Sequence, residues 1–225
     1  MQDQHAALDW QDGRTPVSRQ FADPYFSVDN GLAETAHVFL AGNGLPARFG
    51  GDFQIAELGF GTGLNLLVTW AAWARAGGPG RLHFTSFEAF PMTPADQARA
   101  LAAFPDLAAL TGQLLAALTS GPGPHALTEN LTLHIIQGDA RETLPLWEGR
   151  ADAWFLDGFS PAKNPELWGE DLLAEVALHT KPDGTAATYT AAGHVRRALA
   201  AAGFAVTRQA GYGRKRHMTT ARIPD

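Results

Sequence analysis

Short apolar runs alternate with segments of helical periodicity along most of the chain, from residue 53 onward. The apolar runs predict buried strands at 53–58, 82–87, 131–136, 153–156 and 185–190. The periodic segments predict helices at 64–76, 94–104, 106–118, 167–179 and 194–202. Because strands that alternate with helices form right-handed crossovers, we expect a doubly wound, Rossmann-like α/β fold whose mostly parallel sheet is covered on both faces.

The first 50 residues lack this alternation. They predict, in order, a short strand pair around 8–12 and 17–21 and a helix over 32–40 capped by Asp29 or Asn30. A segment of this length is too short for a large core of its own. We therefore expect residues 1–50 to be an N-terminal extension that packs on a core domain of residues 51–225, over the ligand end or the side of the sheet.

Composition narrows the class of protein. A chain of 225 residues with 45% hydrophobic and 18% charged residues fits one globular domain. The absence of cysteine excludes disulfides, thiolate metal ligands and cysteine nucleophiles. The chain has neither an apolar run long enough to cross a membrane nor a signal-peptide core, and no heptad pattern suggests assembly. We expect a cytoplasmic monomer that binds no membrane and no metal.

The basic residues concentrate at the carboxyl end, where 204–209 and 217–223 predict an antiparallel hairpin that closes through Gly211-Tyr212-Gly213. Residues 184–225 carry seven basic side chains and one acidic, although the whole chain has a net charge of −6. The adjacent cations Arg214, Lys215 and Arg216 must face water, acidic side chains or phosphate. Both an anion-binding patch and a basic tail that solvates a sheet edge or pairs internally stay open.

Three glycines follow the first predicted strand in the sequence Glu57-Leu58-Gly59-Phe60-Gly61-Thr62-Gly63-Leu64-Asn65. Their spacing differs from the dinucleotide fingerprint G-x-G-x-x-G, and the Gly-Lys-Ser/Thr of a P-loop does not follow. With an acidic residue two positions before the first glycine, the pattern fits the S-adenosylmethionine loop of class I methyltransferases. The cofactor residues expected here are Glu57, Gly59, Gly61, Gly63 and Asn65. A glycine turn with a purely structural role is the alternative.

Polar residues also follow the second and third strands, at the edge where ligands of doubly wound sheets bind. Glu88 is placed to accept hydrogen bonds from both ribose hydroxyls of a cofactor. The triplet Gly138-Asp139-Ala140 is placed to meet an adenine amino group. Asp139 also fits a capping box with Glu142 at the start of a helix, and one carboxylate can serve both purposes.

The loop after the fourth strand, from Asp157 to Trp168, is the most unusual stretch. Asp157 ends an apolar strand, and Gly158, Pro161 and Pro165 hold the following loop rigid. Methyltransferases that act on amines use an acidic or amide residue, prolines and an aromatic residue at this place. Asp157 and Phe159 fit those roles, and Lys163 and Asn164 are candidates for contacts to a phosphate or a base edge. The alternative is a plain strand-to-helix turn in which Asn164 or Pro165 starts the helix.

Four stretches carry a family resemblance that covers nearly the whole chain: PVSRQFADPYFSVDNGLAETAHVFLAGN, ELGFGTGLN, FLDGFSPAKNPELW and GYGRKRHM. With them the chain resembles the methyltransferase half of the bacterial bifunctional tRNA modification enzymes of the MnmC type, which make 5-methylaminomethyl-2-thiouridine at the wobble position. Small departures occur at Pro24 and at Ala36-His37. The FAD-dependent oxidase domain of that family has no counterpart in these residues, so the resemblance implies a stand-alone methyltransferase.

The resemblance implies a class I methyltransferase fold, S-adenosyl-L-methionine as cofactor and a tRNA anticodon stem-loop as partner. The implied reaction converts 5-aminomethyl(-2-thio)uridine to 5-methylaminomethyl(-2-thio)uridine, with Asp157 accepting a proton from the amine or orienting it. The substrate side would comprise Tyr25, Glu34, Phe159, Lys163, Asn164, Arg214, Lys215 and Arg216. A small-molecule amine methyltransferase of the same fold is the alternative. A nucleotide-binding oxidoreductase is disfavoured by the glycine spacing, and a non-catalytic binding module by the rigid polar loop.

Overall fold

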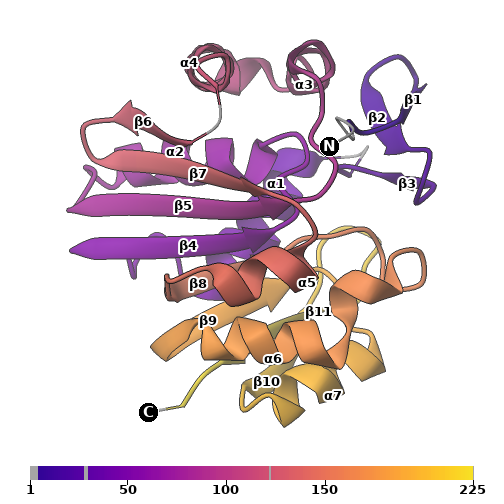
Figure 1. Cartoon of the computed structure of the whole chain (residues 1–225), viewed down its shortest axis with the longest axis vertical. Coiled ribbons are helices and arrows are strands. Elements are labelled where there is room, and N and C mark those ends of the chain that lie inside the picture. Colours follow the sequence, from indigo (N-terminus) through magenta and orange to yellow (C-terminus); the bar gives the residue numbers. More distant parts are fainter. Residues whose placement is uncertain (1–4, 28–29, 122, 225) are drawn as a thin grey trace.

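A computed structural model describes residues 5–27, 30–121 and 123–224 and contains one large sheet (Figure 1). Its eight described strands lie in the order β10-β11-β9-β8-β4-β5-β7-β6. They are β4 (Asp52–Leu58), β5 (Arg81–Glu88), β6 (Pro124–Thr128), β7 (Leu131–Gln137), β8 (Ala151–Leu156), β9 (Thr180–Thr188), β10 (Ala205–Ala210) and β11 (His217–Arg222). Strands β7, β5, β4, β8 and β9 run parallel, which confirms the predicted doubly wound sheet.

The edges of the sheet are antiparallel. Strand β11 pairs with β9 and β10, which confirms the predicted closing hairpin. Strand β6 was missed, because residues 120–130 look like a Gly/Pro-rich connection. Pro124 begins this edge strand, where its missing N–H group removes no bond from the interior of the sheet. Strand β9 begins at Thr180, earlier than predicted, directly after the preceding helix.

Helices cover both faces of the sheet. In chain order they are α1 (Gly31–Thr35), η1 (Ala36–Leu40), η2 (Ala41–Asn43), α2 (Leu64–Arg75), α3 (Pro94–Leu101), η3 (Pro105–Leu107), α4 (Ala108–Leu118), α5 (Ala140–Thr143), η4 (Leu144–Leu146), η5 (Pro165–Trp168), α6 (Glu170–Leu178) and α7 (Gly193–Ala201). One buried cluster joins η1, α2 and α4 to the sheet, and a second joins α5, α6 and α7 to its other face. On β8, Phe155 points into the first cluster and Trp154 into the second, as alternation along a strand requires.

The first residues form a separate three-stranded antiparallel sheet of β1 (Leu8–Gln11), β2 (Thr15–Ser18) and β3 (Asp23–Pro24). Strand β2 begins two residues earlier than predicted, because Asp12 and Gly13 take left-handed φ angles of 51° and 71° and make a tight turn. The sheet lies against α3, where the Arg99 guanidinium sits 3.9 Å from the centre of the Trp10 ring.

The predicted helix over 32–40 forms as consecutive α-, π- and 3₁₀-helical turns from Gly31 to Asn43. Asn30 caps it by accepting a hydrogen bond from the Ala33 N–H at 3.0 Å. Asp29, the other predicted cap, lies outside the described residues. Val38 and Leu40 are buried in the first core cluster, so this segment of the extension packs on the main sheet.

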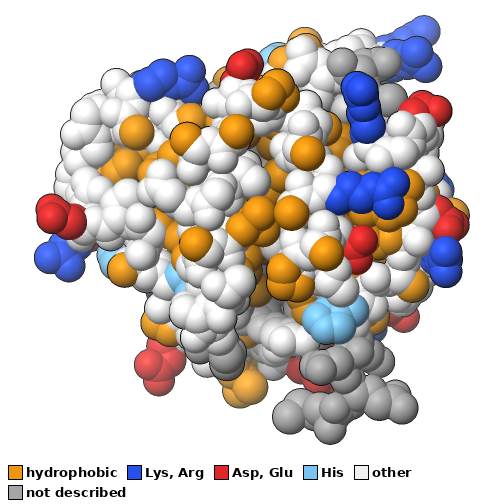
Figure 2. Space-filling view, turned by 90° about the horizontal axis from the view of Figure 1, so that it is seen from above, with side chains coloured by type: hydrophobic (Ala, Val, Ile, Leu, Met, Phe, Trp, Pro, Cys, Tyr) orange, Lys and Arg blue, Asp and Glu red, His pale blue; other side chains and the backbone are white. Residues whose placement is uncertain are grey.

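Helices α3 and α4 lie on one side of the sheet. Figure 2 looks onto the molecule from that side and shows hydrophobic side chains scattered among polar ones. Within the described residues no single helix is long and apolar enough to cross a membrane. Residues 94–118 pass that test of length and composition only as two helices, which are bent by 118°.

Candidate active site

A cavity of about 880 Å³ opens at the carboxyl ends of the parallel strands. In the sheet, β4 has β5 on one side and β8 on the other, and the order of the strands switches direction at β4. Doubly wound sheets bind their ligands at such a switch point, and the cavity lies there. The predicted site residues that line it are Tyr25, Glu34, Gly59, Gly61, Asn65, Glu88, Gly138, Asp139, Ala140, Asp157, Phe159, Asn164, Arg214 and Lys215. The structure also describes the other four predicted residues, but they do not belong to the described lining of the cavity: Glu57, Gly63, Lys163 and Arg216.

The glycine loop after β4 is held tightly against the sheet. Gly59 has a φ of +90°, and a Cβ atom there would lie 2.3 Å from the carbonyl oxygen of Asp157. Only glycine fits such a position. The N–H of Gly61 donates to Glu88 at 2.8 Å, which joins the loop to the end of β5. Gly63, with a φ of +82°, is the N-cap residue of α2 and ends the glycine loop.

A buried polar network lies beneath this loop. The amide nitrogen of Asn65 donates to Glu57 at 2.8 Å and to Asp157 at 2.7 Å. Thr35 donates to the Asn65 oxygen at 3.0 Å, and Ser86 donates to Glu57 at 2.7 Å. Burial raises the pKa of Glu57 well above its usual range. Glu57 is fully buried and does not belong to the described lining of the cavity, so it supports the wall through Asn65 and Ser86, and its direct contact to the cofactor stays a prediction.

Asp157 stands at the end of β8 with part of its surface open to the cavity. Burial raises its pKa to about 7, against the opposing effects of the Asn65 hydrogen bond and the positive charge of Lys215. Both protonation states are thus populated near neutral pH. A carboxyl group with that property is suited to accept a proton from a bound ligand.

Glu88 closes the cavity at the end of β5. Its two oxygens accept the N–H groups of Gly61 at 2.8 Å and Phe90 at 2.7 Å. Burial raises the pKa of Glu88, and the backbone hydrogen bonds oppose this effect. A carboxylate has about four acceptor positions, so two remain for a ligand. Its proposed contact to ribose hydroxyls stays a prediction.

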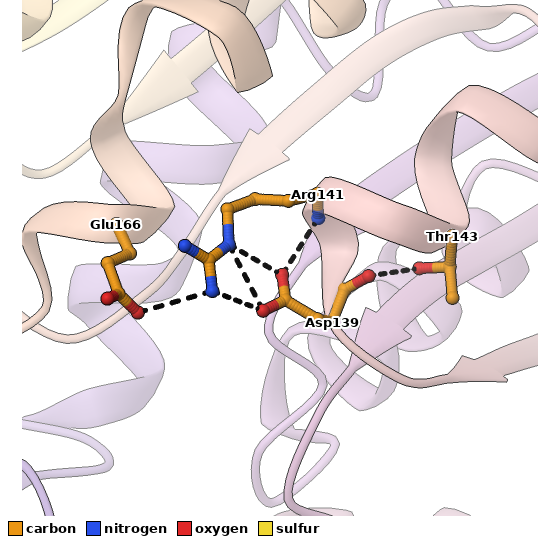
Figure 3. A network of polar contacts seen from close by, with 4 residues as sticks. All are labelled: Asp139, Arg141, Thr143 and Glu166. Carbon is orange, nitrogen blue, oxygen red and sulfur yellow. Dashed lines mark hydrogen bonds and ion pairs between the residues drawn. The ribbon is translucent and has the colours of Figure 1, made fainter.

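At the adenine end of the predicted cofactor site, Asp139 caps α5 by accepting the Arg141 N–H at 2.9 Å. The Arg141 guanidinium also spans both Asp139 oxygens, with a closest distance of 2.6 Å, and reaches Glu166 at 3.4 Å (Figure 3). These hydrogen bonds lower the pKa of Asp139, so it is ionised. The predicted helix cap forms, and an adenine amino group would share Asp139 with Arg141.

The loop after Asp157 is fixed to the N-terminal extension. The ring of Phe159 stacks on Phe21 at 4.8 Å and meets the edge of Tyr25 at 4.9 Å. Asp23 accepts the Ser160 N–H at 2.9 Å and the Lys163 ammonium at 2.7 Å. Lys163 therefore holds the loop to the first residues of the chain, and its contact to a phosphate or a base edge stays a prediction.

The three adjacent cations of the β10–β11 turn are arranged differently from one another. Lys215 points to the cavity, where its ammonium lies 2.7 Å from Glu34 and 4.0 Å from the centre of the Tyr189 ring. Arg214 also lines the cavity, whereas Arg216 is exposed outside that lining. Lys215 thus forms an internal ion pair, one of the alternatives that the sequence left open for this cluster, and a contact of the three cations to phosphate stays a prediction.

The structure adds cavity residues that the sequence did not single out. Tyr189 follows β9 at the same edge as the predicted site, and its hydroxyl donates to the Gly158 carbonyl at 2.7 Å. The predicted strand 185–190 ran past the observed end of β9 at Thr188, so Tyr189 was counted as part of the strand and not as a residue that follows it. Burial raises the pKa of Tyr189, so the phenol is neutral. Phe21 and Asp23 belong to the first stretch of the family resemblance, but the sequence did not show their contacts, because their partners lie more than 130 positions away.

Comparisons with known proteins identify the family of the chain and match its fold. A family model described as S-adenosyl-L-methionine-dependent methyltransferase matches residues 108–224. Two relatives are called tRNA 5-methylaminomethyl-2-thiouridine biosynthesis bifunctional protein MnmC. The one from Chromobacterium violaceum is 49% identical over 96% of this chain and 34% of its own length. The one from Pseudomonas aeruginosa strain PAO1 is 50% identical over 96% of this chain and 34% of its own length. The chain thus spans about a third of the curated relatives it matches.

Solved structures agree. The crystal structure of MNMC2 from Aquifex aeolicus covers 100% of this chain and 73% of its own, with a TM-score of 0.77 and 28% identity. The crystal structure of TrmN from Thermus thermophilus covers 81% of this chain and 47% of its own, with a TM-score of 0.52 and 17% identity. At that identity it supports the fold alone.

Proposed function

Because the chain belongs to the S-adenosyl-L-methionine-dependent methyltransferases whose family model matches residues 108–224, we propose that it methylates the aminomethyl nitrogen of a modified wobble uridine in tRNA. The product would be 5-methylaminomethyl(-2-thio)uridine, the nucleoside in the names of the relatives. The observation that carries the proposal is Asp157, a carboxyl group with a pKa of about 7 in the cavity of a methyltransferase fold. It is suited to an acceptor that must lose a proton.

The cavity fits the cofactor. Sites for ligands of this size measure about 300–1,000 Å³, and this one measures about 880 Å³. Gly61 leaves room for the Tyr25 ring, since a Cβ atom there would lie 3.1 Å from it. Gly59 and Gly61 would meet the amino acid part, Glu88 the ribose, and Gly138 to Ala140 the adenine. When bound, S-adenosyl-L-methionine supplies a methyl group on a sulfonium, and the amine nitrogen gains that methyl and loses one proton.

Asp157 would accept that proton. A primary ammonium has a pKa of about 10.4, and an ordinary Asp of about 3.9, so the transfer would be uphill by roughly six powers of ten. With its pKa raised to about 7, Asp157 reduces that gap to about three powers of ten. Asn65 holds one oxygen of Asp157 at 2.7 Å and leaves the other for the acceptor. Glu57 fixes Asn65 in turn.

The acceptor base would lie against Phe159, whose ring is fixed by Phe21 and Tyr25. Tyr25 and Phe21 belong to residues 1–50, which we propose to be an N-terminal extension that completes the substrate side of a methyltransferase domain of residues 51–225. Asn164 lines the same cavity and is our candidate for a base edge. The proposal implies a protein that works on tRNA in the cytoplasm as a monomer.

The direct test is transfer of labelled methyl from S-adenosyl-L-methionine to bulk tRNA from cells that lack this modification. Label should appear in the wobble nucleoside, and tRNA from cells with complete modification should take up none. Small primary amines serve as the comparison, because a small-molecule methyltransferase of the same fold is the alternative. Label on free amines with none on unmodified tRNA would overturn the proposal in favour of that alternative.

Arg214 and Arg216 are our candidates for contacts to tRNA phosphates. Each phosphate contact on single-stranded nucleic acid adds about 0.7 to the salt slope, so changing both to Ala should flatten the dependence of log KM on log salt by about 1.4. KM for tRNA should rise while the Kd for S-adenosyl-L-methionine holds. The matched control is Arg75→Ala with Arg81→Ala, on exposed arginines at the end of α2 and the start of β5, away from the cavity. An equal change in the control would mean that only net charge matters.

A further inference from the structure

Lys215 occupies a subsite built for an alkylammonium ion. Its ammonium contacts the Glu34 carboxylate at 2.7 Å and lies over the Tyr189 ring at 4.0 Å from the centroid. A carboxylate and an aromatic face are the groups that proteins use to hold such cations. Asp157 lines the same cavity and senses the charges of both Lys215 and Glu34.

The two partners differ in how firmly they are placed. The Glu34 side chain is 14% exposed and belongs to α1, which packs beside α2. The Lys215 side chain is 45% exposed and belongs to the β10–β11 turn, where the Lys215 N–H donates to the Tyr212 carbonyl. Lys215 can therefore turn its ammonium to water by side-chain rotation alone, whereas Glu34 would remain in the cavity wall.

The acceptor of the proposed reaction carries the same chemical group as Lys215. An aminomethyl group is a primary alkylammonium at neutral pH, and it must reach the cavity that holds Asp157. If it entered without displacing Lys215, the two cations would compete for Glu34. If Lys215 left first, Glu34 would be a largely buried charge without a partner, which is costly. A direct exchange of one ammonium for the other avoids both states.

Resting on the proposed function, we propose that Glu34 and Tyr189 form the subsite for the substrate ammonium and that Lys215 occupies it until the substrate displaces it. The subsite selects acceptors with a cationic amine, because a neutral group cannot replace Lys215 on Glu34. The released Lys215 then stands on the same turn as Arg214 and Arg216 and faces the RNA. Glu34 is thus a specificity-determining residue, and Lys215 couples amine entry to contact with phosphate.

The test measures binding to protein loaded with S-adenosyl-L-homocysteine, which has no methyl to transfer. Two acceptors are compared by calorimetry: the nucleoside 5-aminomethyluridine, and an anticodon stem-loop RNA with that nucleoside at the wobble position. Removing the competitor with Lys215→Gln should lower the Kd for the nucleoside about threefold. The same variant should raise the Kd for the stem-loop and flatten its salt slope by about 0.7, since a phosphate contact is lost.

Glu34→Gln should raise the Kd for 5-aminomethyluridine about tenfold and leave weak binding of plain uridine unchanged. In the Glu34→Gln background, Lys215→Gln should no longer improve nucleoside binding, because the competition takes place on Glu34. The matched control is Lys181→Gln. The Lys181 ammonium lies 2.6 Å from the Asp152 carboxylate, in an ion pair of similar length and exposure to that of Lys215 and Glu34. Neither Lys181 nor Asp152 belongs to the described lining of the cavity. Lys181→Gln should change neither Kd.

A purely structural Lys215 predicts the opposite pattern. In that case Lys215→Gln would lower the melting temperature and weaken both acceptors alike, and this result would overturn the subsite. An unchanged nucleoside Kd would overturn it as well. The proposed function is judged separately: if the stem-loop neither binds nor takes up methyl while Lys215→Gln still tightens the nucleoside, the tRNA assignment fails and the subsite stands. If the stem-loop is methylated but Lys215→Gln leaves the nucleoside Kd unchanged, the tRNA assignment stands and the subsite fails.

Discussion

Replacing Asp157 with Asn is expected to lower kcat by about 10²–10⁴-fold, the range for loss of a positioned proton acceptor. The side chain keeps its shape and an oxygen that can accept from Asn65, so the cavity should persist. The Kd for S-adenosyl-L-methionine should stay within about threefold, because the partner of Asp157 is the acceptor amine. Equal losses in kcat and in cofactor affinity would make Asp157 a cofactor ligand, and full activity would remove it from the chemistry.

The same variant has a signature in pH. In the wild type, log kcat/KM should rise with pH up to about 7, because Asp157 accepts a proton only when ionised, and Asp157→Asn should lose that limb. The effect on stability has the opposite sign. A carboxyl group whose pKa is raised in the folded state favours folding while protonated, so its contribution is lost as pH rises from about 4 to 7. Asp157→Asn should therefore gain melting temperature over the wild type across that interval and hold the gain above it.

The core of the site could be predicted because a doubly wound sheet brings the carboxyl ends of its parallel strands to one edge. Glycines and carboxylates that directly follow predicted strands, such as Gly59, Glu88 and Asp157, were therefore expected together, and all line the cavity. Their roles follow from chemistry at that edge and stay predictions until measured.

Contacts between distant segments could not be predicted in the same way. The sequence shows that Lys163 and Lys215 are charged but does not show that Asp23 and Glu34, 140 and 181 positions away, pair with them. The orientation of Glu57 is a related case. Its position in the loop motif could be read from the sequence, but only the fold shows that Asn65 and Ser86 hold its side chain in the interior. Long-range ion pairs and burial are thus what the structure adds.

The first 50 residues provide part of the cavity wall. Phe21 and Tyr25 hold the ring of Phe159, and Asp23 holds the backbone and the lysine of the same loop. Glu34 brings a carboxylate to the amine end of the cavity. On the proposed function, the doubly wound sheet would supply the general methyl-transfer site, and the choice of acceptor would depend on how these first residues fold against it.

Glu88→Ala is expected to weaken S-adenosyl-L-methionine binding by about 10²–10⁴-fold, because it removes two charge-assisted hydrogen bonds of roughly 1.5–3 kcal/mol each. Glu88 also accepts the N–H groups of Gly61 and Phe90, so part of the loss would come from a looser glycine loop. A double-mutant-type cycle separates the two contributions: the Kd values of the natural cofactor and of an analogue that lacks the ribose hydroxyls are measured for the wild type and for Glu88→Ala. If Glu88 binds those hydroxyls, the analogue should bind the wild type clearly more weakly than the natural cofactor does, and adding Glu88→Ala should cost the analogue only the part of the loss that comes from the loop. If the losses simply add, Glu88 acts through the loop and not on the ribose, and an unchanged Kd for the natural cofactor would remove it from the cofactor site.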